Sequence, residues 1–266
     1  LPESVPGASP NTGYYGGGYA PGSSPSSTAT MDKTNFANDT TATVPNAALS
    51  AARGGVSGAS NLTDGYFAGG QGDSSALSTM DKVTYASDTT AAVPGAKLTV
   101  ARRQGGATGN LNFGYFGGGT PSTVSIMDKC TYSSDTTARV PGADLSSARH
   151  SATATGNTVA GYFAGGQPGP KSTVDKVTYS TDTTAALPSG ANLSSSRYGT
   201  GASGNSDVGY FGGGYAPSSG FSTVDKVTYS TDTTARVPGA NLSVKRAFPG
   251  ATGNSTAGYF MSGDSF

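Results

Sequence analysis

One stretch of the chain decides its fold: GYFAGGQPGPKSTVDKVTYSTDTTAALPSGANLSSSR, residues 161–197. Close copies of this stretch fill most of the 266 residues. Their common start, Gly-Tyr followed by Phe or Tyr, recurs with spacings of 47 to 52 residues at Gly13, Gly65, Gly114, Gly161, Gly209 and Gly258. The chain is therefore a tandem repeat of five full units and the beginning of a sixth.

Fixed spacings inside the unit separate a rigid part from a variable one. An Asp-Lys pair precedes the Asp-Thr-Thr-Ala motif by 7 residues in every unit, and the Arg that ends a unit precedes the next Gly-Tyr by 12. The step from Gly-Tyr to Asp-Lys instead varies from 14 to 19 residues, and its sequence varies too. Because a packed unit tolerates few insertions whereas an exposed loop tolerates many, this segment is predicted to be a surface loop.

Each unit is predicted to contain four short β-strands. In the second unit GYFA is aromatic, DKVTY alternates as a strand does, with Val83 and Tyr85 on one face, and TTAAV is β-prone. Gly, an Asp-Thr-Thr turn and Pro separate these segments. The Gly/Ala-rich residues after the Arg form the fourth strand, which ends in a Gly-Asn turn. No window of ten residues shows helical periodicity, so we expect essentially no helix.

The unit resembles a kelch repeat in its aromatic strand ending in a Gly pair, its tyrosine strand, its polar turn and its Pro-containing link to an Arg. The resemblance covers Gly13 to Phe260. It departs from the family at one point, because residues such as Ala91 and Ala185 stand where kelch repeats usually carry a Trp. The resemblance implies an all-β propeller of four-stranded blades. We expect residues 13–266 to form a single propeller domain, preceded by residues 1–12, whose VPGA sequence resembles the end of a preceding blade.

The number of strands leaves the closure of the ring open. If the strands are named a to d from the axis outward, the chain supplies six b strands, which begin at Gly-Tyr, and five each of a, c and d. Five blades are favoured: the a strand after Arg246 would complete the first blade, and one b strand, within residues 13–18 or 258–263, would be surplus. The alternatives are a six-bladed ring, which lacks a c strand unless another chain donates it, and an exchange of strands between chains.

Composition excludes several kinds of function. Sixteen Lys and Arg balance sixteen Asp and Glu, so the chain lacks the basic surface that nucleic acids require. One Cys and one His exclude a thiolate zinc cage and any site with two imidazoles, and we predict no metal and no cofactor. No apolar run of about 18 residues is present, so no membrane span is predicted. Cys130 replaces a Val and is interpreted as a small buried hydrophobe, and His150 as a tolerant surface position.

Most charged residues belong to the repeat and are interpreted as structural. Each Asp of Asp-Thr-Thr would cap a turn, and each closing Arg would pair with acids or carbonyls between blades. The alternative is five equivalent binding sites, one in each blade. The residues concerned are Asp39, Asp88, Asp135, Asp182 and Asp232, with Arg53, Arg102, Arg149, Arg197 and Arg246.

An enzyme is not expected. Propellers that cleave glycans need two or three carboxylates converging on the axis. The one Glu, Glu3, lies near the start of the sequence, and Asp64 and Asp207 occupy equivalent positions just before Gly-Tyr, which is typical of turn residues. A glycoside hydrolase is therefore the third hypothesis, behind binding and assembly.

The variable loops are the candidate recognition surface. In a four-stranded blade the loops from b to c lie at the same end as the links from d to the next a strand, so we expect the loops to gather on one face. Their aromatic rings, amides and charges suit stacking and hydrogen bonding with a sugar or a protein surface. The candidate binding residues are Tyr19, Gln71, Asp73, Gln167, Lys171, Tyr215 and Phe221.

The units, which are nearly identical to one another, are similar to kelch-type repeats in predicted tail-fibre and other surface proteins of marine viruses and bacteria. This likeness implies that the chain lies on a virion or is extracellular. The first hypothesis is a non-enzymatic binding or adhesion propeller that recognises a glycan or a surface protein. The second is a structural building block of an extracellular fibre or coat, which self-assembles with other structural chains through an unsatisfied terminal strand.

Overall fold

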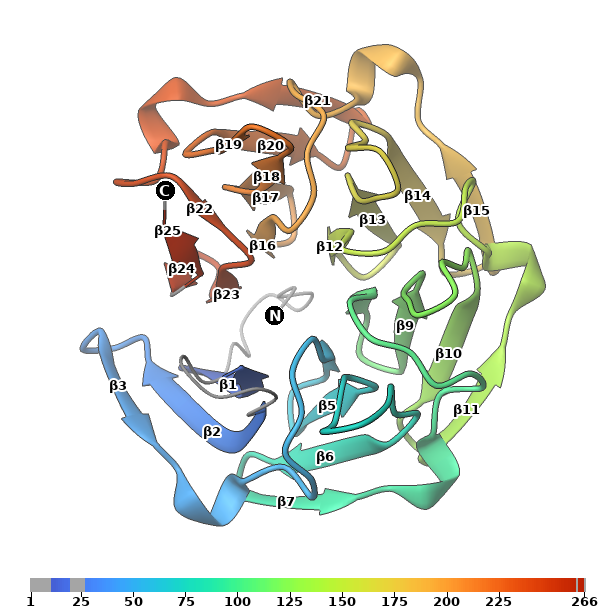
Figure 1. The fold of residues 1–266 in the computed structure, drawn as a ribbon, viewed down its shortest axis with the longest axis vertical. Coiled ribbons are helices and arrows are strands. Elements are labelled where there is room, and N and C mark those ends of the chain that lie inside the picture. Colours follow the sequence, from blue (N-terminus) through green and yellow to red (C-terminus); the bar gives the residue numbers. More distant parts are fainter. Residues whose placement is uncertain (1–10, 20–26, 262, 266) are drawn as a thin grey trace.

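The computed structural model describes residues 11–19, 27–261 and 263–265, which form an all-β propeller of five blades around a central axis (Figure 1). Four blades are antiparallel sheets of four strands, ordered a to d from the axis outward. The second blade contains β4 (Ser57–Ser60), β5 (Asp64–Ala68), β6 (Met80–Thr84) and β7 (Thr89–Ala92), and the third contains β8 (Gly106–Gly109), β9 (Phe113–Gly117), β10 (Met127–Thr131) and β11 (Thr136–Arg139). The fourth contains β12 (Thr153–Gly156), β13 (Ala160–Ala164), β14 (Val174–Thr178) and β15 (Thr183–Ala186), and the fifth contains β16 (Gly201–Gly204), β17 (Val208–Gly212), β20 (Val224–Thr228) and β21 (Thr233–Arg236).

The first blade has three strands among the described residues. They pair in the order β1 (Thr12–Tyr19), β2 (Ser27–Asn35) and β3 (Thr40–Thr43), which are its b, c and d strands. The VPGA sequence at residues 5–8, which resembles the end of a preceding blade, lies outside the described residues.

A two-stranded hairpin, β23 (Gly250–Gly253) with β24 (Gly258–Met261), lies between the fifth blade and the first (Figure 1). Gly258 packs against Ser203 of the fifth blade, and Gly13 of the first blade packs against Thr252 of the hairpin. Gly161 packs in the same way against Thr108 of the third blade. The hairpin therefore occupies the inner part of a further place in the ring, which we call the sixth position.

The all-β, five-bladed fold is confirmed, but the predicted pairing of the a strand after Arg246 with the first blade is wrong. β23 pairs with β24 rather than with β1, and β24 is the surplus b strand. The turn between β23 and β24 is built locally, because the side-chain oxygen of Asn254 accepts hydrogen bonds from the N–H groups of Thr256 and Ala257. A short hairpin loop costs less entropy to close than a contact between distant segments of the chain.

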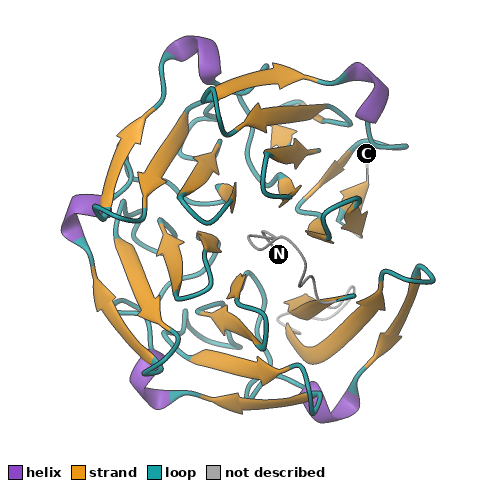
Figure 2. Ribbon diagram, turned by 180° about the vertical axis from the view of Figure 1, so that it is seen from behind, coloured by secondary structure: helices purple, strands orange, loops and turns teal. Residues whose placement is uncertain are grey.

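The helical elements among the described residues are five 3₁₀ turns of three residues each, at the outer edge of the ring (Figure 2). Four of them begin at the Pro that follows the d strand, because its fixed φ suits the first position of such a turn. They are η1 (Pro45–Ala47), η2 (Pro94–Ala96), η3 (Pro141–Ala143), η4 (Ser189–Ala191) and η5 (Pro238–Ala240). Two short pairings also occur, between β18 (Tyr215–Ala216) and β19 (Ser219–Gly220) and between β22 (Arg246–Ala247) and β25 (Asp264–Ser265).

Gly118 explains why the aromatic strand of each of the five blades ends in a Gly pair. It has a φ of +70°, and a Cβ at this position would lie 2.4 Å from the carbonyl oxygen of Arg149. The same carbonyl accepts a hydrogen bond from the N–H of Gly119 at 2.9 Å. The end of the b strand is thereby fixed against the link that leads into the next blade, and only Gly fits there without strain.

The apolar core lies between the blades. In five of the six b strands the Tyr stacks on the aromatic ring that follows the c strand of the next blade, as in Tyr66 and Tyr132, whose ring centroids lie 4.6 Å apart. Stacked rings of this kind bury a large apolar area at each interface. The other pairs are Tyr14 with Tyr85, Tyr115 with Tyr179, Tyr162 with Tyr229, and Tyr259 with Phe36.

Candidate binding face

Four of the five closing arginines form buried ion pairs with the Asp of the Asp-Lys motif in the following blade. Arg149 and Asp175 are both 0% exposed, and 2.7 Å separates Nη2 from Oδ2. Asp175 also accepts hydrogen bonds from the N–H and hydroxyl of Ser146. Burial lowers the pKa of Arg149, while the adjacent Asp175 raises it. Equivalent pairs join Arg53 to Asp81, Arg102 to Asp128 and Arg197 to Asp225.

The Asp of each Asp-Thr-Thr motif lies in the turn between c and d with a left-handed backbone, at φ between 50° and 55°. Its carboxylate reaches back to the preceding blade: Asp182 accepts a hydrogen bond from the Tyr115 hydroxyl at 2.5 Å and pairs with Lys129 at 2.8 Å. The same arrangement joins Tyr14 and Lys33 to Asp88, Tyr66 and Lys82 to Asp135, and Tyr162 and Lys176 to Asp232. These repeated charged groups join each blade to the next.

The variable loops and the links between blades meet on one face, which we call the rim face. Short antiparallel bridges join the residue after each closing Arg to the start of the neighbouring loop. The bridges are Gly54 to Gln71, Arg103 to Thr120, His150 to Gln167, Tyr198 to Tyr215, and Ala247 to Asp264. Gln71, Gln167 and Tyr215, three of the predicted binding residues, therefore lie beside the residues that follow the closing arginines.

A hydrogen-bonded backbone ring lies at the centre of the rim face. Four hydrogen bonds of 2.7 to 2.9 Å form this ring, which is open between Phe248 and Gly55. In each of them an N–H donates to the carbonyl of the equivalent residue in the previous blade, along the series Gly55, Gln104, Ser151, Gly199 and Phe248. All five residues have positive φ, between 53° and 66°. The backbone therefore repeats around the axis while the side chains at these positions differ from blade to blade.

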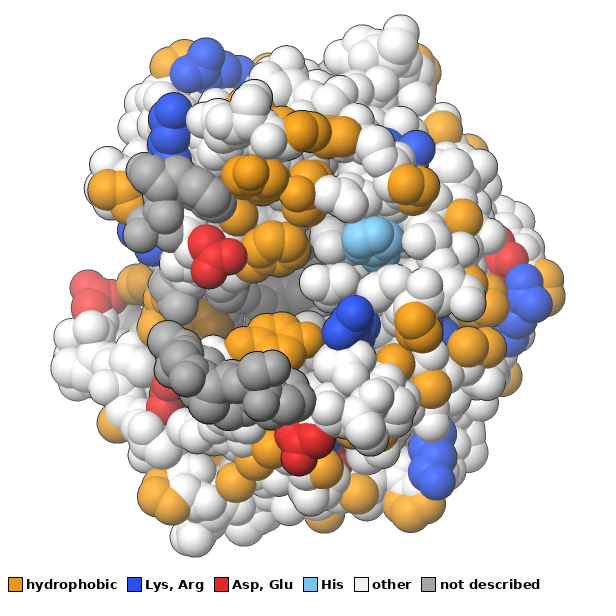
Figure 3. All heavy atoms as spheres, viewed as in Figure 1, with side chains coloured by type: hydrophobic (Ala, Val, Ile, Leu, Met, Phe, Trp, Pro, Cys, Tyr) orange, Lys and Arg blue, Asp and Glu red, His pale blue; other side chains and the backbone are white. Residues whose placement is uncertain are grey.

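One side of the rim face is basic and polar. Nη1 of Arg103 donates to Oε1 of Gln71 at 2.9 Å, which links the second and third blades. Nδ1 of His150 lies 3.1 Å from the Ser151 hydroxyl. Burial and the nearby charge of Arg103 both lower the pKa of His150. Figure 3 shows this face, with the single His of the chain close to basic and apolar side chains.

The next part of the rim face is aromatic. The ring of Tyr198 meets those of Tyr215 and Phe248 edge to face, with centroids 5.5 and 6.0 Å apart. Phe248 is 44% exposed, and its ring lies against Gly199, where a Cβ would approach it to 2.7 Å. Gln167 lies within hydrogen-bonding reach of the Tyr198 hydroxyl. Aromatic rings beside amide groups suit a ligand that has both apolar faces and hydroxyl groups.

The remaining predicted binding residues are Tyr19, Asp73, Lys171 and Phe221. Tyr19 is 53% exposed, and its ring lies over Gly54. Asp73 is exposed in the second loop. Phe221 lies over the guanidinium of Arg197, 5.9 Å from centroid to Cζ, and the backbone of Lys171 bonds to Gly166 and Arg197. Phe221 and Lys171 therefore support their loops as well as lining them.

Sequence reasoning missed Arg103, His150, Tyr198 and Phe248 as members of this surface. They occupy the two positions after the closing Arg, where the repeats differ in residue type although the spacing to the next Gly-Tyr never changes. This combination of fixed spacing and variable identity is the signal that could have identified them.

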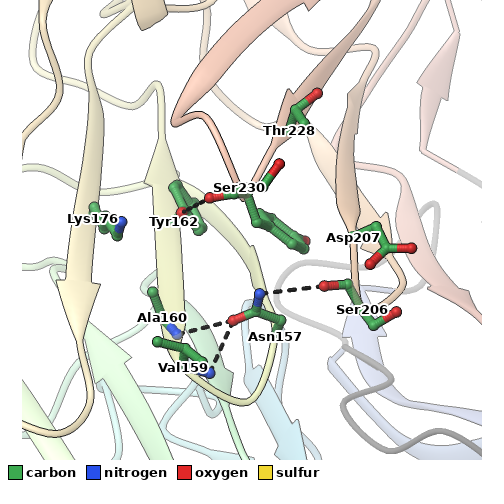
Figure 4. Close-up of a pocket in the computed structure, with 10 residues that line it drawn as sticks. Asn157, Val159, Ala160, Tyr162, Lys176, Ser206, Asp207, Thr228 and Ser230 are labelled. Atoms are coloured by element: carbon green, nitrogen blue, oxygen red, sulfur yellow. Dashed lines mark hydrogen bonds between the residues drawn. The ribbon is translucent and has the colours of Figure 1, made fainter.

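A cavity of about 450 Å³ lies between the fourth and fifth blades, at the turns opposite the rim face (Figure 4). Its wall includes Tyr162, whose hydroxyl donates to Asp232 of the fifth blade, and Asn157, whose side-chain N–H donates to the Ser206 carbonyl. Burial raises the pKa of Tyr162, as does its hydrogen bond to Asp232. Because these groups belong to the contacts that join the blades, we assign the cavity to the scaffold and retain the rim face as the candidate site.

The structure thus defines a repeat propeller whose charged groups largely join its blades and whose differing side chains gather around one end of the axis. No family model matches the chain, and no curated protein matches it. Among the described residues, no helix has the length and apolar character needed to cross a membrane. That part of the chain also contains no cluster of three or more His, Cys, Asp or Glu that could hold a metal ion.

Proposed function

We propose that this chain is a non-enzymatic recognition propeller of kelch-like repeats that binds a glycan or a surface protein through its rim face. The observation that carries the proposal is the backbone ring at Gly55, Gln104, Ser151, Gly199 and Phe248, which repeats in every blade while its side chains do not. A stiff scaffold that displays different side chains around one axis is suited to recognition.

The chemistry of the rim face favours a sugar or a polar protein surface. Tyr198, Tyr215 and Phe248 offer ring faces and edges for stacking, while Gln167 and Arg103 offer hydrogen-bond donors close by. The repeat pattern, which resembles predicted tail-fibre and surface proteins, supports a place on a virion or cell surface.

A glycan array probed with the purified chain, followed by titration of the hits, tests this proposal; intact cells serve as the target for a protein partner. Phe248→Gly and Tyr198→Ala are expected to weaken binding about tenfold or more, as central aromatic residues do. Phe248→Gly is especially informative, because Gly already occupies the equivalent Gly55 and Gly199 and the variant should fold at least as stably. Val159→Ala, at an exposed residue of the opposite turns, is the matched control. Unchanged binding by both rim variants would exclude the rim face.

A second function, assembly into a fibre or coat through terminal strands, is favoured by the outer edge of β24. Among the described residues this strand pairs only with β23, whereas the b strands of the five blades each pair with a c strand. An unpaired edge strand is a template for a strand from another chain. Sizing and electron microscopy test this function, with filaments or defined oligomers as the supporting result and a monodisperse monomer against it.

A further inference from the structure

The contacts that join one blade to the next are interrupted at the sixth position. Within the described residues, Lys226 of the fifth blade has no carboxylate partner, although the four equivalent lysines all pair with a turn Asp of the next blade. Tyr210, which belongs to the same set of contacts, is half-buried, whereas Tyr66, Tyr115 and Tyr162 are buried. Lys226 and Tyr210 therefore face a place that a turn Asp fills elsewhere.

The first blade presents the complementary half of the same contact. Asp39 accepts a hydrogen bond from the hydroxyl of Tyr259 in β24, as its equivalents do from their b-strand tyrosines. Each of those equivalents also receives a Lys from the adjacent c strand, and no described Lys reaches Asp39. The sixth position thus offers a cation on one side and an anion on the other.

The apolar contacts of the fifth blade are incomplete in the same place. Ala240 of η5 is exposed and Leu242 is half-buried, while the alanines and leucines at these two positions in the other four units are at most 6% exposed. In those units the Leu belongs to the same apolar cluster as a Val of the next c strand, as Leu145 does with Val177, or as Cys130 in the cluster of Leu98. In three of these units a Thr of the next d strand also donates to the Ala carbonyl, as Thr184 does to Ala143 at 2.7 Å.

The edge of β24 fixes the register that an added strand would take. In the second blade Tyr66 pairs with Lys82 and Phe67 with Asp81, and the other complete blades have the same register. An added strand in this register places its Lys opposite Tyr259, on the side of Asp39, and its Asp opposite Phe260. The turn that follows would then carry its own Asp towards Lys226.

We propose that the sixth position is a docking site for a β-hairpin of the Asp-Lys to Asp-Thr-Thr type, donated by another polypeptide that carries this repeat. The argument is complementarity: the hairpin's Lys meets Asp39, its turn Asp meets Lys226 and Tyr210, and its Val covers Leu242. This inference deepens the assembly function above, on which it rests, and is independent of ligand binding at the rim face.

The test uses the full chain and a fluorescein-labelled peptide with the sequence of residues 222–240, STVDKVTYSTDTTARVPGA. Anisotropy titration is expected to give saturable binding, and the peptide is expected to raise the melting temperature of the chain by mass action. A scrambled peptide is expected not to bind. The proposal would be overturned if binding did not saturate up to about 1 mM peptide, because a dissociation constant of that size corresponds to a binding free energy of only about 4 kcal/mol.

Charge variants with matched controls separate docking from general stability. Asp39→Asn and Lys226→Met should weaken peptide binding about threefold to tenfold, because each removes one partly buried charged contact. Asp88→Asn and Lys176→Met remove the same groups at intact interfaces, and should lower the melting temperature while leaving peptide affinity unchanged. Equal effects from test and control variants would refute the assigned contacts.

A charge reversal makes the assignment specific. Lys226→Glu should abolish binding of the original peptide and restore it for a peptide with Lys in place of its Asp232. If the chain instead forms dimers, and the peptide neither binds to them nor displaces the partner, the sixth position is covered by a different part of a second copy and the donated hairpin is excluded. If filaments form although no peptide binds, the assembly function stands and this docking site is wrong.

Discussion

Arg149→Met is the most decisive substitution in the scaffold. It keeps most of the apolar stem of the side chain but removes the guanidinium that pairs with Asp175 at 2.7 Å, where neither side chain is exposed. Asp175 then keeps only its hydrogen bonds from Ser146. The variant therefore leaves a carboxylate buried without a counter-charge at the interface between the third and fourth blades.

The magnitude follows from the cost of an unpaired buried charge. Removing one partner of a buried pair destabilises proteins by about 3–5 kcal/mol. With about 2 °C lost per kcal/mol for a chain of this length, the melting temperature should fall by about 6–10 °C. The control is Arg139→Ala, which breaks a pair with Asp144 whose side chains are 47% and 22% exposed. Exposed pairs contribute about 1 kcal/mol or less.

The assay is urea unfolding followed by tyrosine fluorescence, since the chain has 14 Tyr and no Trp. Adding Asp175→Asn to Arg149→Met should recover about 1–2 kcal/mol, because it removes the isolated charge. If Arg149→Met costs no more than Arg139→Ala, or if the double variant is less stable than the single one, the buried-pair reasoning is refuted.

Three further predictions concern the scaffold. Gly118→Ala should clearly lower the melting temperature, because the residue has a positive φ and the added Cβ would lie 2.4 Å from a carbonyl oxygen. In Gly190→Ala the added Cβ meets open space, so this variant should be neutral or slightly stabilising. Equal effects of the two variants in thermal melts would contradict the prediction. Burial raises the pKa of Cys130 to about 11, so a thiol reagent at pH 8 should label it only after unfolding, and rapid labelling of the folded chain would disprove its burial. Burial raises the pKa of Asp88, but hydrogen bonds from Tyr14 and Lys33 outweigh this effect and lower the pKa overall. The stabilisation that the Asp88 carboxylate provides is therefore present above about pH 4 and is lost as the pH falls further. Asp88→Asn should flatten the fall in melting temperature between about pH 5 and 3, and an unchanged slope would count against this prediction.

The repeat spacing was sufficient to predict the blade but not the closure of the ring. The Gly pair, the Asp-Thr-Thr turn and the Pro link each act within one unit, so their sequence identifies four strands and their order. The partner of β23 depends on a competition between a hairpin closed by Asn254 and a contact with β1 at the other end of the sequence. Counting strands cannot decide that competition, because it depends on loop entropy and on the fit of neighbouring blades.

The candidate site was predicted in part for a similar reason. Gln71, Gln167 and Tyr215 were identified because their loops vary in length. Arg103 and Tyr198 were missed because their segments do not vary in length, and because the β-bridges that bring them to those loops join residues 17 positions apart. A pattern based on length detects loops that tolerate insertions, whereas the proposed recognition surface also includes positions whose backbone is fixed.

The backbone ring gives a physical reason to regard those fixed positions as functional. A left-handed backbone costs a residue with a side chain roughly 1–2 kcal/mol relative to Gly, and Gly occupies the ring at Gly55 and Gly199. Gln104, Ser151 and Phe248 keep the same φ, and Phe248 also leaves an apolar ring 44% exposed to solvent. Stability alone would favour Gly at all three positions, and strain of this kind is retained where a side chain is needed for function. Gln104→Gly and Ser151→Gly should therefore raise the melting temperature, as Phe248→Gly should, and the binding that each of these replacements removes measures what its side chain contributes at the rim face.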